Sequence, residues 1–314
     1  GLYNTWGYYT PSLELYKAFE EGDTRRDATI LSPGQHIQFM GQDILFGGYS
    51  PDGSVYSITS RTTAHVSAGM VLRKFMSPWE TGSYSEVSNL RDKLWNSLNC
   101  CLMRYADVLL MAAEAANELN DLPYAKEQLR KVRFRAFKSN EAVDKYLEGI
   151  GSKDAMFKAI YRERMLEFSC EQIRKQDLIR WGLLKKSLDD VKGKMKAMLD
   201  HTTYTSELTD KTYDFSLVDT KVYYKYDADG ETIQLHGLDF GEAGEPDGEG
   251  WTLYTSKKTD GTLEEEYIKS GTTSTGRIDM IYQYDPDVHM FWPIFKQSIT
   301  TNSLLANDYG YPVR

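Results

Sequence analysis

Residues 163–182 read ERMLEFSCEQIRKQDLIRWG and mix acidic, basic and large apolar side chains. Glu163, Glu167 and Glu171 recur at four-residue intervals, which places neighbouring members of this row one helical turn apart. Paired carboxylates of this kind can act as acid and base in the hydrolysis of a glycosidic bond. The segment is therefore either a row of catalytic glutamates or a charged helix that supports the fold.

Basic residues in the same segment favour the structural interpretation. Glu171 lies three residues before Arg174 and four before Lys175, and Asp177 lies three residues before Arg180. Side chains at these spacings meet on a helix and form ion pairs. An arginine beside a carboxyl group lowers its pKa, so the group loses the proton that a general acid must donate. We therefore interpret these charges as an ion-pair network.

The composition argues against several classes of function. The chain of 314 residues has a formal net charge of −9 and a pI of about 5.2, whereas nucleic-acid binding needs a basic surface. The sequence contains no common catalytic, phosphate-binding or dinucleotide-binding motif, and its histidines show no metal-ligand spacing. No apolar run is long enough to span a bilayer. We expect no nucleic-acid partner, no metal and no cofactor.

The cysteines are expected to be buried free thiols. Cys100, Cys101 and Cys170 are odd in number and two of them are adjacent, which does not fit a disulfide framework. All three occur among apolar residues, as buried cysteines usually do.

Hydrophobic periodicity predicts a mainly α-helical centre. Apolar residues recurring at three and four positions predict a helix over Leu98–Leu119, and a second helix is expected over Tyr124–Phe137. Together they have the shape of a two-helix repeat of the TPR kind. Further helices are predicted over residues 152–179 and 183–199, and a short one lies within residues 10–19.

The regions on either side of this centre are expected to be loops and short strands. Residues 31–98 are rich in Gly, Ser, Thr and Pro, with a short strand expected at 54–58. Residues 221–226 and 231–235 form a hairpin pattern around Asp227–Gly230, and residues 277–284 suggest another strand. The pattern predicts an α-rich fold with a small β insert.

Two charged positions are expected to be structural. Glu114 lies on an otherwise apolar helix, and a buried carboxylate needs an arginine partner such as Arg133, Arg135 or Arg164. Residues 23–27, which read DTRRD, are expected to form a salt bridge that fixes a loop rather than a metal site.

Two acidic clusters have some of the residues of a metal site. Asp285, Asp287 and His289 can ligate a divalent ion, but Asp-Pro usually begins a turn, which is the interpretation we prefer. Asp227–Gly230 lacks the glutamate that closes a calcium loop, so it is expected to be a hairpin turn.

Aromatic residues in polar surroundings are the candidates for ligand binding. The chain has 22 tyrosines, and rigid aromatic rings can stack on flat ligands, sugars or peptides. Packing beneath loops is the alternative for each residue taken singly. The candidates are Trp6, Tyr56, Trp79, Tyr84 and Trp95.

Four segments in order resemble the SusD/RagB family. They are residues 104–117 (RYADVLLMAAEAAN) together with 130–136 (RKVRFRA), the opening segment 163–182, residues 10–26, and residues 289–312. Phe295 departs from the family, which often has Pro there. Ser169 to Arg174 also depart from it, because the family often reads F-E-G-x-R in this part of the segment and this chain has no Gly there.

This resemblance implies a surface-exposed lipoprotein of the outer membrane that binds a glycan or peptide. Family members deliver their ligand to a SusC-like TonB-dependent transporter and are not enzymes. Family members extend further at the N-terminus. The chain is therefore expected to be the C-terminal portion of such a protein, with the lipid anchor in the N-terminal part of that protein. Two alternatives remain: a glycan-active hydrolase using the Glu163/Glu167 region, and a structural or adhesive surface subunit.

The expected organisation is one SusD/RagB-like domain over residues 1–314. Its parts are a loop-rich surface (31–98), a helical scaffold (98–199), a β-rich insert (201–285) and a C-terminal segment (286–314).

Overall fold

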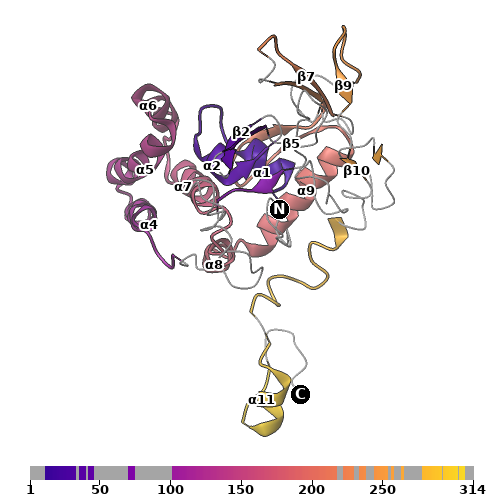
Figure 1. Ribbon diagram of the computed structural model, residues 1–314. Helices are drawn as coiled ribbons and strands as arrows, with labels where there is room; N and C mark the ends of the chain where they lie inside the picture. Colours follow the sequence, from indigo (N-terminus) through magenta and orange to yellow (C-terminus); the bar gives the residue numbers. More distant parts are fainter. Residues whose placement is uncertain are drawn as a thin grey trace.

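The computed structural model describes most of the helical centre and several strands beside it (Figure 1). The described residues are 11–32, 35–39, 42–45, 70–74, 101–217, 222–229, 233–237, 244–253, 256–257, 263–264, 278–291, 293–302 and 304–307. Helices dominate this part of the chain, and its strands are short and antiparallel. The prediction of a mainly α fold with a small β element is confirmed.

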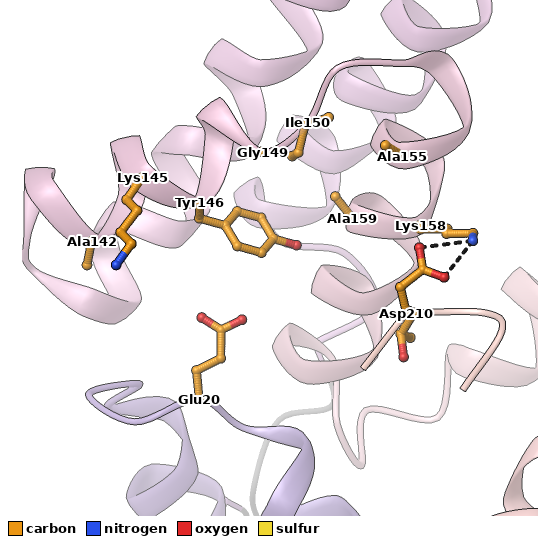
Figure 2. Close-up of a pocket in the computed structure, with 11 residues that line it drawn as sticks. Glu20, Ala142, Lys145, Tyr146, Gly149, Ile150, Ala155, Lys158, Ala159 and Asp210 are labelled. Carbon is orange, nitrogen blue, oxygen red and sulfur yellow. Dashed lines mark hydrogen bonds and ion pairs between the residues drawn. The ribbon is translucent and has the colours of Figure 1, made fainter. Parts of the chain in front are cut away.

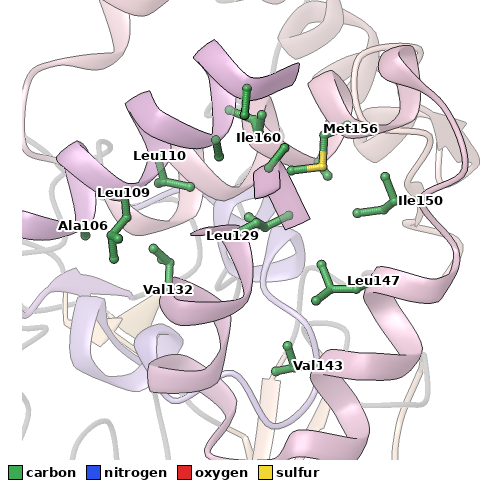
Figure 3. Close-up of a cluster of buried hydrophobic side chains, with 14 of the residues drawn as sticks. Ala106, Leu109, Leu110, Leu129, Val132, Val143, Leu147, Ile150, Met156 and Ile160 are labelled. Atoms are coloured by element: carbon green, nitrogen blue, oxygen red, sulfur yellow. The ribbon is translucent and has the colours of Figure 1, made fainter. Parts of the chain in front are cut away.

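Four consecutive helices pack together, and we call this group the helical scaffold. Its members are α4 (Tyr105–Glu118), α5 (Leu122–Phe137), α6 (Asn140–Glu148) and α7 (Lys153–Glu167). α4 packs against α5 and α7, and α5 also packs against α6 and α7. Apolar side chains from all of these helices fill the space between them (Figure 3). Leu110, Leu129 and Ile160 are completely buried. Each such side chain stabilises the fold by about 1.5–3 kcal/mol.

Local signals define where these helices begin and end. The side chains of Asp121, Ser139 and Ser152 each accept a hydrogen bond from the backbone N–H three residues later, at the start of α5, α6 and α7. Such N-caps typically contribute about 1 kcal/mol. Asn120 and Lys138 have positive φ angles of 61° and 52°, which end α4 and α5.

The observed helices differ from the predicted ones in three places. The helix predicted from Leu98 begins only at Tyr105, and the unpredicted helix α6 follows α5 closely. The helix predicted over 152–179 is interrupted, because Cys170 and Gln172 take φ angles of 66° and 65° that a helix does not allow. The chain then continues as α8 (Arg174–Arg180) and α9 (Leu184–Leu199), and the second of these was predicted.

A second hydrophobic core lies beside α7. It is formed by α1 (Leu13–Ala18), α9, β5 (Thr203–Thr205) and β6 (Thr212–Asp214), which lie near one another in Figure 1. Leu166 of α7 packs into this core with Phe19, Met198 and Phe215. α7 is therefore buried on two sides, which explains why its charged side chains lie inside the protein.

The short strands form small separate sheets. β7 (Val222–Tyr226) pairs with both β8 (Ile233–Gly237) and β9 (Thr252–Leu253), which confirms the predicted hairpin. The remaining pairs are β1 (Ile30–Leu31) with β4 (Val71–Leu72), β2 (His36–Phe39) with β3 (Gln42–Leu45), β5 with β6, and β10 (Ser256–Lys257) with β11 (Leu263–Glu264). Two short helices complete the described elements, α2 (Arg25–Thr29) and α11 (Lys296–Thr301).

The strand predicted at 277–284 is wrong. Its described part begins with a helical turn, in which Ile281 N–H donates to the Ile278 carbonyl at 3.2 Å, and continues as bends. Contacts with α9 hold this segment, because the Tyr282 hydroxyl donates to Asp189. The strand predicted at 54–58 lies outside the described residues.

For two of the three cysteines the prediction of a free thiol is confirmed and the prediction of burial is wrong. Cys101 and Cys170 are exposed free thiols, because Cys101 precedes α4 and Cys170 lies in the chain reversal after α7. Cys100 lies outside the described residues. None of the helices in the described ranges combines the length and the apolar character needed to cross a membrane.

Candidate functional site

The glutamates at the end of α7 point into the protein interior. Glu163 is 0% exposed and Glu167 is 2% exposed, so both carboxylates have lost almost all contact with water. A buried charge is tolerated only where partners compensate it. The partners of these carboxylates decide whether the row can perform acid–base chemistry.

Both oxygens of Glu163 are occupied by arginines. Arg25 Nη1 donates to Oε1 at 2.6 Å, and Arg133 Nη1 donates to Oε2 at 2.9 Å. Arg25 is held in turn by Asp23, which accepts from Nη2 at 2.7 Å and from Nε at 2.9 Å. The salt bridge predicted for residues 23–27 is confirmed, and it extends into the core rather than staying within its loop.

Three arginines surround Glu167. Arg25 Nη1 donates to Oε2 at 3.0 Å, while Arg104 and Arg135 both donate to Oε1. Burial alone would raise the pKa of Glu167, but these guanidinium groups outweigh it and lower the pKa to about 2. Glu167 is therefore ionised at neutral pH and holds no proton to donate.

Glu171 completes the network near the surface. Arg104 donates to Glu171 through Nε at 2.9 Å and through Nη2 at 2.8 Å. Lys74 Nζ lies 2.5 Å from Oε1 of Glu171. Burial would raise the pKa of Glu171, yet Arg104 and Lys74 lower it overall. We call the three glutamates and their basic partners the α7 ion network. It confirms the predicted ion-pair role of the row.

Most partners in the α7 ion network are not the predicted helical neighbours. The expected Glu171–Arg174 pair is wrong, because Arg174 donates to the Tyr161 carbonyl at 3.1 Å and lies 3.9 Å from the centre of the Tyr161 ring. The chain reversal before α8 turns Arg174 away from Glu171. The expected Asp177–Arg180 pair within α8 is confirmed at 2.9 Å.

Glu114 has a partner of the expected kind but from another helix. Arg180 Nη2 donates to it at 2.7 Å and Trp181 Nε1 at 2.8 Å. The hydrogen-bonded arginine is thus not one of the expected Arg133, Arg135 and Arg164, although the charge of Arg164 also lowers the pKa of Glu114. The reason is that α8 folds back over α4 after the chain reversal. Burial would raise the pKa of Glu114, but the bonds from α8 lower it.

The five aromatic residues predicted to bind ligand all lie outside the described residues, namely Trp6, Tyr56, Trp79, Tyr84 and Trp95. Their role stays a prediction. The preferred interpretation of the DPDVH segment is confirmed: Asp285 Oδ1 accepts from Asp287 N–H at 3.1 Å, and the Asp285 carbonyl accepts from His289 N–H at 2.9 Å, which forms a turn.

A hollow lies between the helical scaffold and the second core, and sequence patterns did not indicate it. We call it the α6–α7 pocket; its volume is about 520 Å³, within the range of about 300–1,000 Å³ usual for small-molecule sites (Figure 2). Its lining comes from α6, the link to α7, the first turns of α7, Glu20 and the β5–β6 turn. Because α6 itself was not predicted, no sequence signal placed these residues together.

The fold and the buried charges define a class of protein: a mainly helical scaffold of TPR-like pairs held together by a buried ion network, with short strands beside it. The chain belongs to the SusD family, whose sequence profile matches residues 4–311.

The chain is also similar to individual proteins. SusD-like protein P25 of Formosa agariphila is 39% identical over 110 residues, which are 32% of this chain and 20% of that protein. A solved SusD homolog from Bacteroides thetaiotaomicron is 24% identical, with a TM-score of 0.42 over 58% of this chain and 34% of the other. A SusD-like protein from Bacteroides fragilis is 17% identical, with a TM-score of 0.47 over 98% of this chain and 47% of the other. Each match thus takes in less than half of the relative's length.

Proposed function

We propose that the chain is part of a nutrient-binding protein that captures an oligosaccharide, or a peptide, at the cell surface. The captured ligand passes to a SusC-like TonB-dependent transporter in the outer membrane. A lipid anchor holds the protein at the membrane, and residues 1–314 act as one domain. The observation that carries this proposal is membership of the SusD family over residues 4–311.

The α7 ion network supports a binding role over the hydrolase alternative. A general acid needs a proton near neutral pH, whereas the pKa of Glu167 is lowered to about 2. Glu163 is completely buried and both its oxygens accept from arginines, so no substrate oxygen can reach it without breaking those bonds. The network thus stabilises the scaffold, and the protein is proposed to bind without catalysis.

Ligand binding is proposed to rest on the loop aromatics. Trp79 and Trp95 are the strongest candidates, because a tryptophan ring offers the largest rigid apolar face for a sugar or peptide. The region 31–98 that contains both of them is the proposed ligand-facing surface.

A binding assay and a membrane pull-down test the proposal. The intact protein is screened against immobilised oligosaccharides and peptides, and Trp79→Ala and Trp95→Ala are compared with it. The proposal is supported if the intact protein binds a class of ligand that neither variant binds. Unchanged binding in both variants refutes the choice of residues.

The pull-down tests the partner. The tagged protein is recovered from detergent-solubilised outer membranes, where a copurifying TonB-dependent barrel is expected. Ligand turnover by the wild-type protein, lost in Glu167→Gln with folding intact, would instead establish the hydrolase. If the protein binds no ligand in the screen and no barrel copurifies with it, the adhesive alternative remains.

A further inference from the structure

The α6–α7 pocket has a rigid wall. Arg133 lies 3.5 Å from the centre of the Tyr146 ring, and its guanidinium also donates to Glu20 at 2.7 Å and to Glu163 at 2.9 Å. Arg133 is almost completely buried. One fixed guanidinium therefore holds both Tyr146 and Glu20 in place, so a ligand entering the pocket meets groups that are already ordered. Such preorganisation lowers the entropic cost of binding.

The pocket presents polar groups that have capacity left for a ligand. Figure 2 shows the Tyr146 ring extending across the pocket, with the Glu20 carboxylate below it and Lys145 on the same side as Ala142. In the described part of the chain, neither the Tyr146 hydroxyl nor the Lys145 ammonium group has a hydrogen-bond partner. Each Glu20 oxygen accepts one arginine bond and keeps a second lone pair.

Most of the charges that line the pocket are compensated, and Lys145 is the exception among the described residues. Glu20 is bound by Arg133 and Arg162, each at 2.7 Å, and Asp210 is bound by Lys158 at 2.8 Å. An ammonium group entering here meets Lys145 and the two arginines behind Glu20, whereas a carboxylate meets the negative charge of Glu20 as well as the ammonium group of Lys145. The apolar part of the lining is formed by Ala155 and by Ala159 and Ile150, which are almost fully buried, beside the Tyr146 ring. A neutral ligand with an apolar face and several hydroxyl groups satisfies all of these features.

We propose that the α6–α7 pocket binds a single neutral pyranose ring. The apolar C–H face of the sugar lies against the Tyr146 ring and the alanines, and its hydroxyl groups donate to Glu20 and accept from Lys145 and the Tyr146 hydroxyl. This site lies mainly on the helical scaffold, and its described lining residues all come from outside region 31–98. The choice of a sugar as ligand rests on the proposed function, whereas the existence of a binding pocket does not.

A blocking variant tests the site without disturbing its ion pairs. Ala142 is exposed at the edge of the pocket, so Ala142→Trp places a large ring in it and leaves Arg133, Glu20 and Tyr146 unchanged. Ala115→Trp, at an exposed position of α4, is the matched control. The probes are neutral methyl pyranosides, followed by saturation-transfer NMR on the intact protein. We expect Ala142→Trp to weaken binding at least about 10-fold, which corresponds to about 1.4 kcal/mol, and Ala115→Trp to leave it unchanged.

A second variant tests the chemistry of recognition. Tyr146→Phe keeps the ring on Arg133 and removes only the hydroxyl, so it is expected to weaken binding of the same methyl pyranosides severalfold. Binding that survives Ala142→Trp unchanged overturns the proposed site, and binding of uronic acids alone overturns the charge argument. Neither result touches the proposed nutrient-binding function. That function fails separately, if the intact protein retains no oligosaccharide and no peptide in the array.

Discussion

Arg133 of α5 and Glu163 of α7 face each other in the core, with 2.9 Å between Nη1 and Oε2 and with both side chains almost fully buried. They lie 30 residues apart in the chain, and Arg25, which binds the other oxygen of Glu163, lies 138 residues away from it. The contact thus links three distant parts of the sequence. It makes α7 the element around which the helical scaffold and the second core are joined.

Removing the charge of Glu163 is expected to destabilise the protein strongly. Glu163→Gln leaves Arg25 and Arg133 buried with one fewer negative partner, and breaking a buried pair in this way costs about 3–5 kcal/mol. Chemical denaturation followed by circular dichroism measures the change in the free energy of unfolding. Glu127→Gln is the matched control, since Glu127 pairs with Lys131 on the exposed face of α5. Equal stability of the two variants would contradict the central role of Glu163.

The stability of the protein is expected to fall in mild acid because of Glu167. Its pKa is lowered from 4.5 to about 2 in the folded state, so the unfolded state binds a proton first as the pH falls. The resulting contribution, up to about 3 kcal/mol, is complete above about pH 4.5 and is lost progressively toward pH 2. Urea denaturation between pH 3 and pH 7 should therefore show the free energy of unfolding decreasing as the pH falls, and we call this decrease the acid slope. Glu167→Gln should flatten this slope, whereas Glu118→Gln, at the exposed end of α4, should keep it.

Lys211 is expected to make stability rise with pH as well, but in the alkaline range. Burial, together with Arg162, Lys17 and Lys194, lowers the pKa of Lys211 from 10.5 to about 8. Between these values the folded state releases a proton that the unfolded state keeps, so stability rises with pH. Lys211→Met should remove this rise in unfolding free energy between pH 8 and pH 10. Lys196→Met, on the exposed side of α9, serves as the control, and a rise of the same size in both variants would refute the assignment.

The fold could be predicted from the sequence where a signal is local. The periodic apolar residues of α4, the break between α4 and α5 and the hairpin around Asp227 all depend on signals within a few residues, so they can be recognised without knowing the rest of the structure. α6 escaped prediction because it is only Asn140–Glu148, shorter than the span over which periodicity is distinctive.

The partners of the buried charges depend on tertiary structure. The spacing of the glutamates indicated neutralisation, but the reversal at Cys170 and Gln172 requires left-handed backbone at residues other than glycine, which no motif announces. That reversal redirects Arg174 and brings Arg180 to Glu114. The α6–α7 pocket depends on the same kind of long-range packing, so it too could be found only in three dimensions.

Gly193 provides a test of how α9 packs on β5. A Cβ atom at Gly193 would lie 2.7 Å from Cζ of the Tyr204 ring, which is too close for van der Waals contact. Tyr204 is half-buried against the second core and its hydroxyl donates to Asp190 at 3.1 Å, so the ring cannot move aside without losing that bond. Replacing a helical glycine by alanine usually stabilises a helix by about 1 kcal/mol. Here the clash should reverse the sign, and Gly193→Ala is expected to lower the free energy of unfolding by about 1–3 kcal/mol.

Thermal denaturation measures this change, with Gly151→Ala as the control because a Cβ atom there meets nothing within 4 Å. A Gly193→Ala variant as stable as the wild type would mean that Tyr204 does not hold its position against α9.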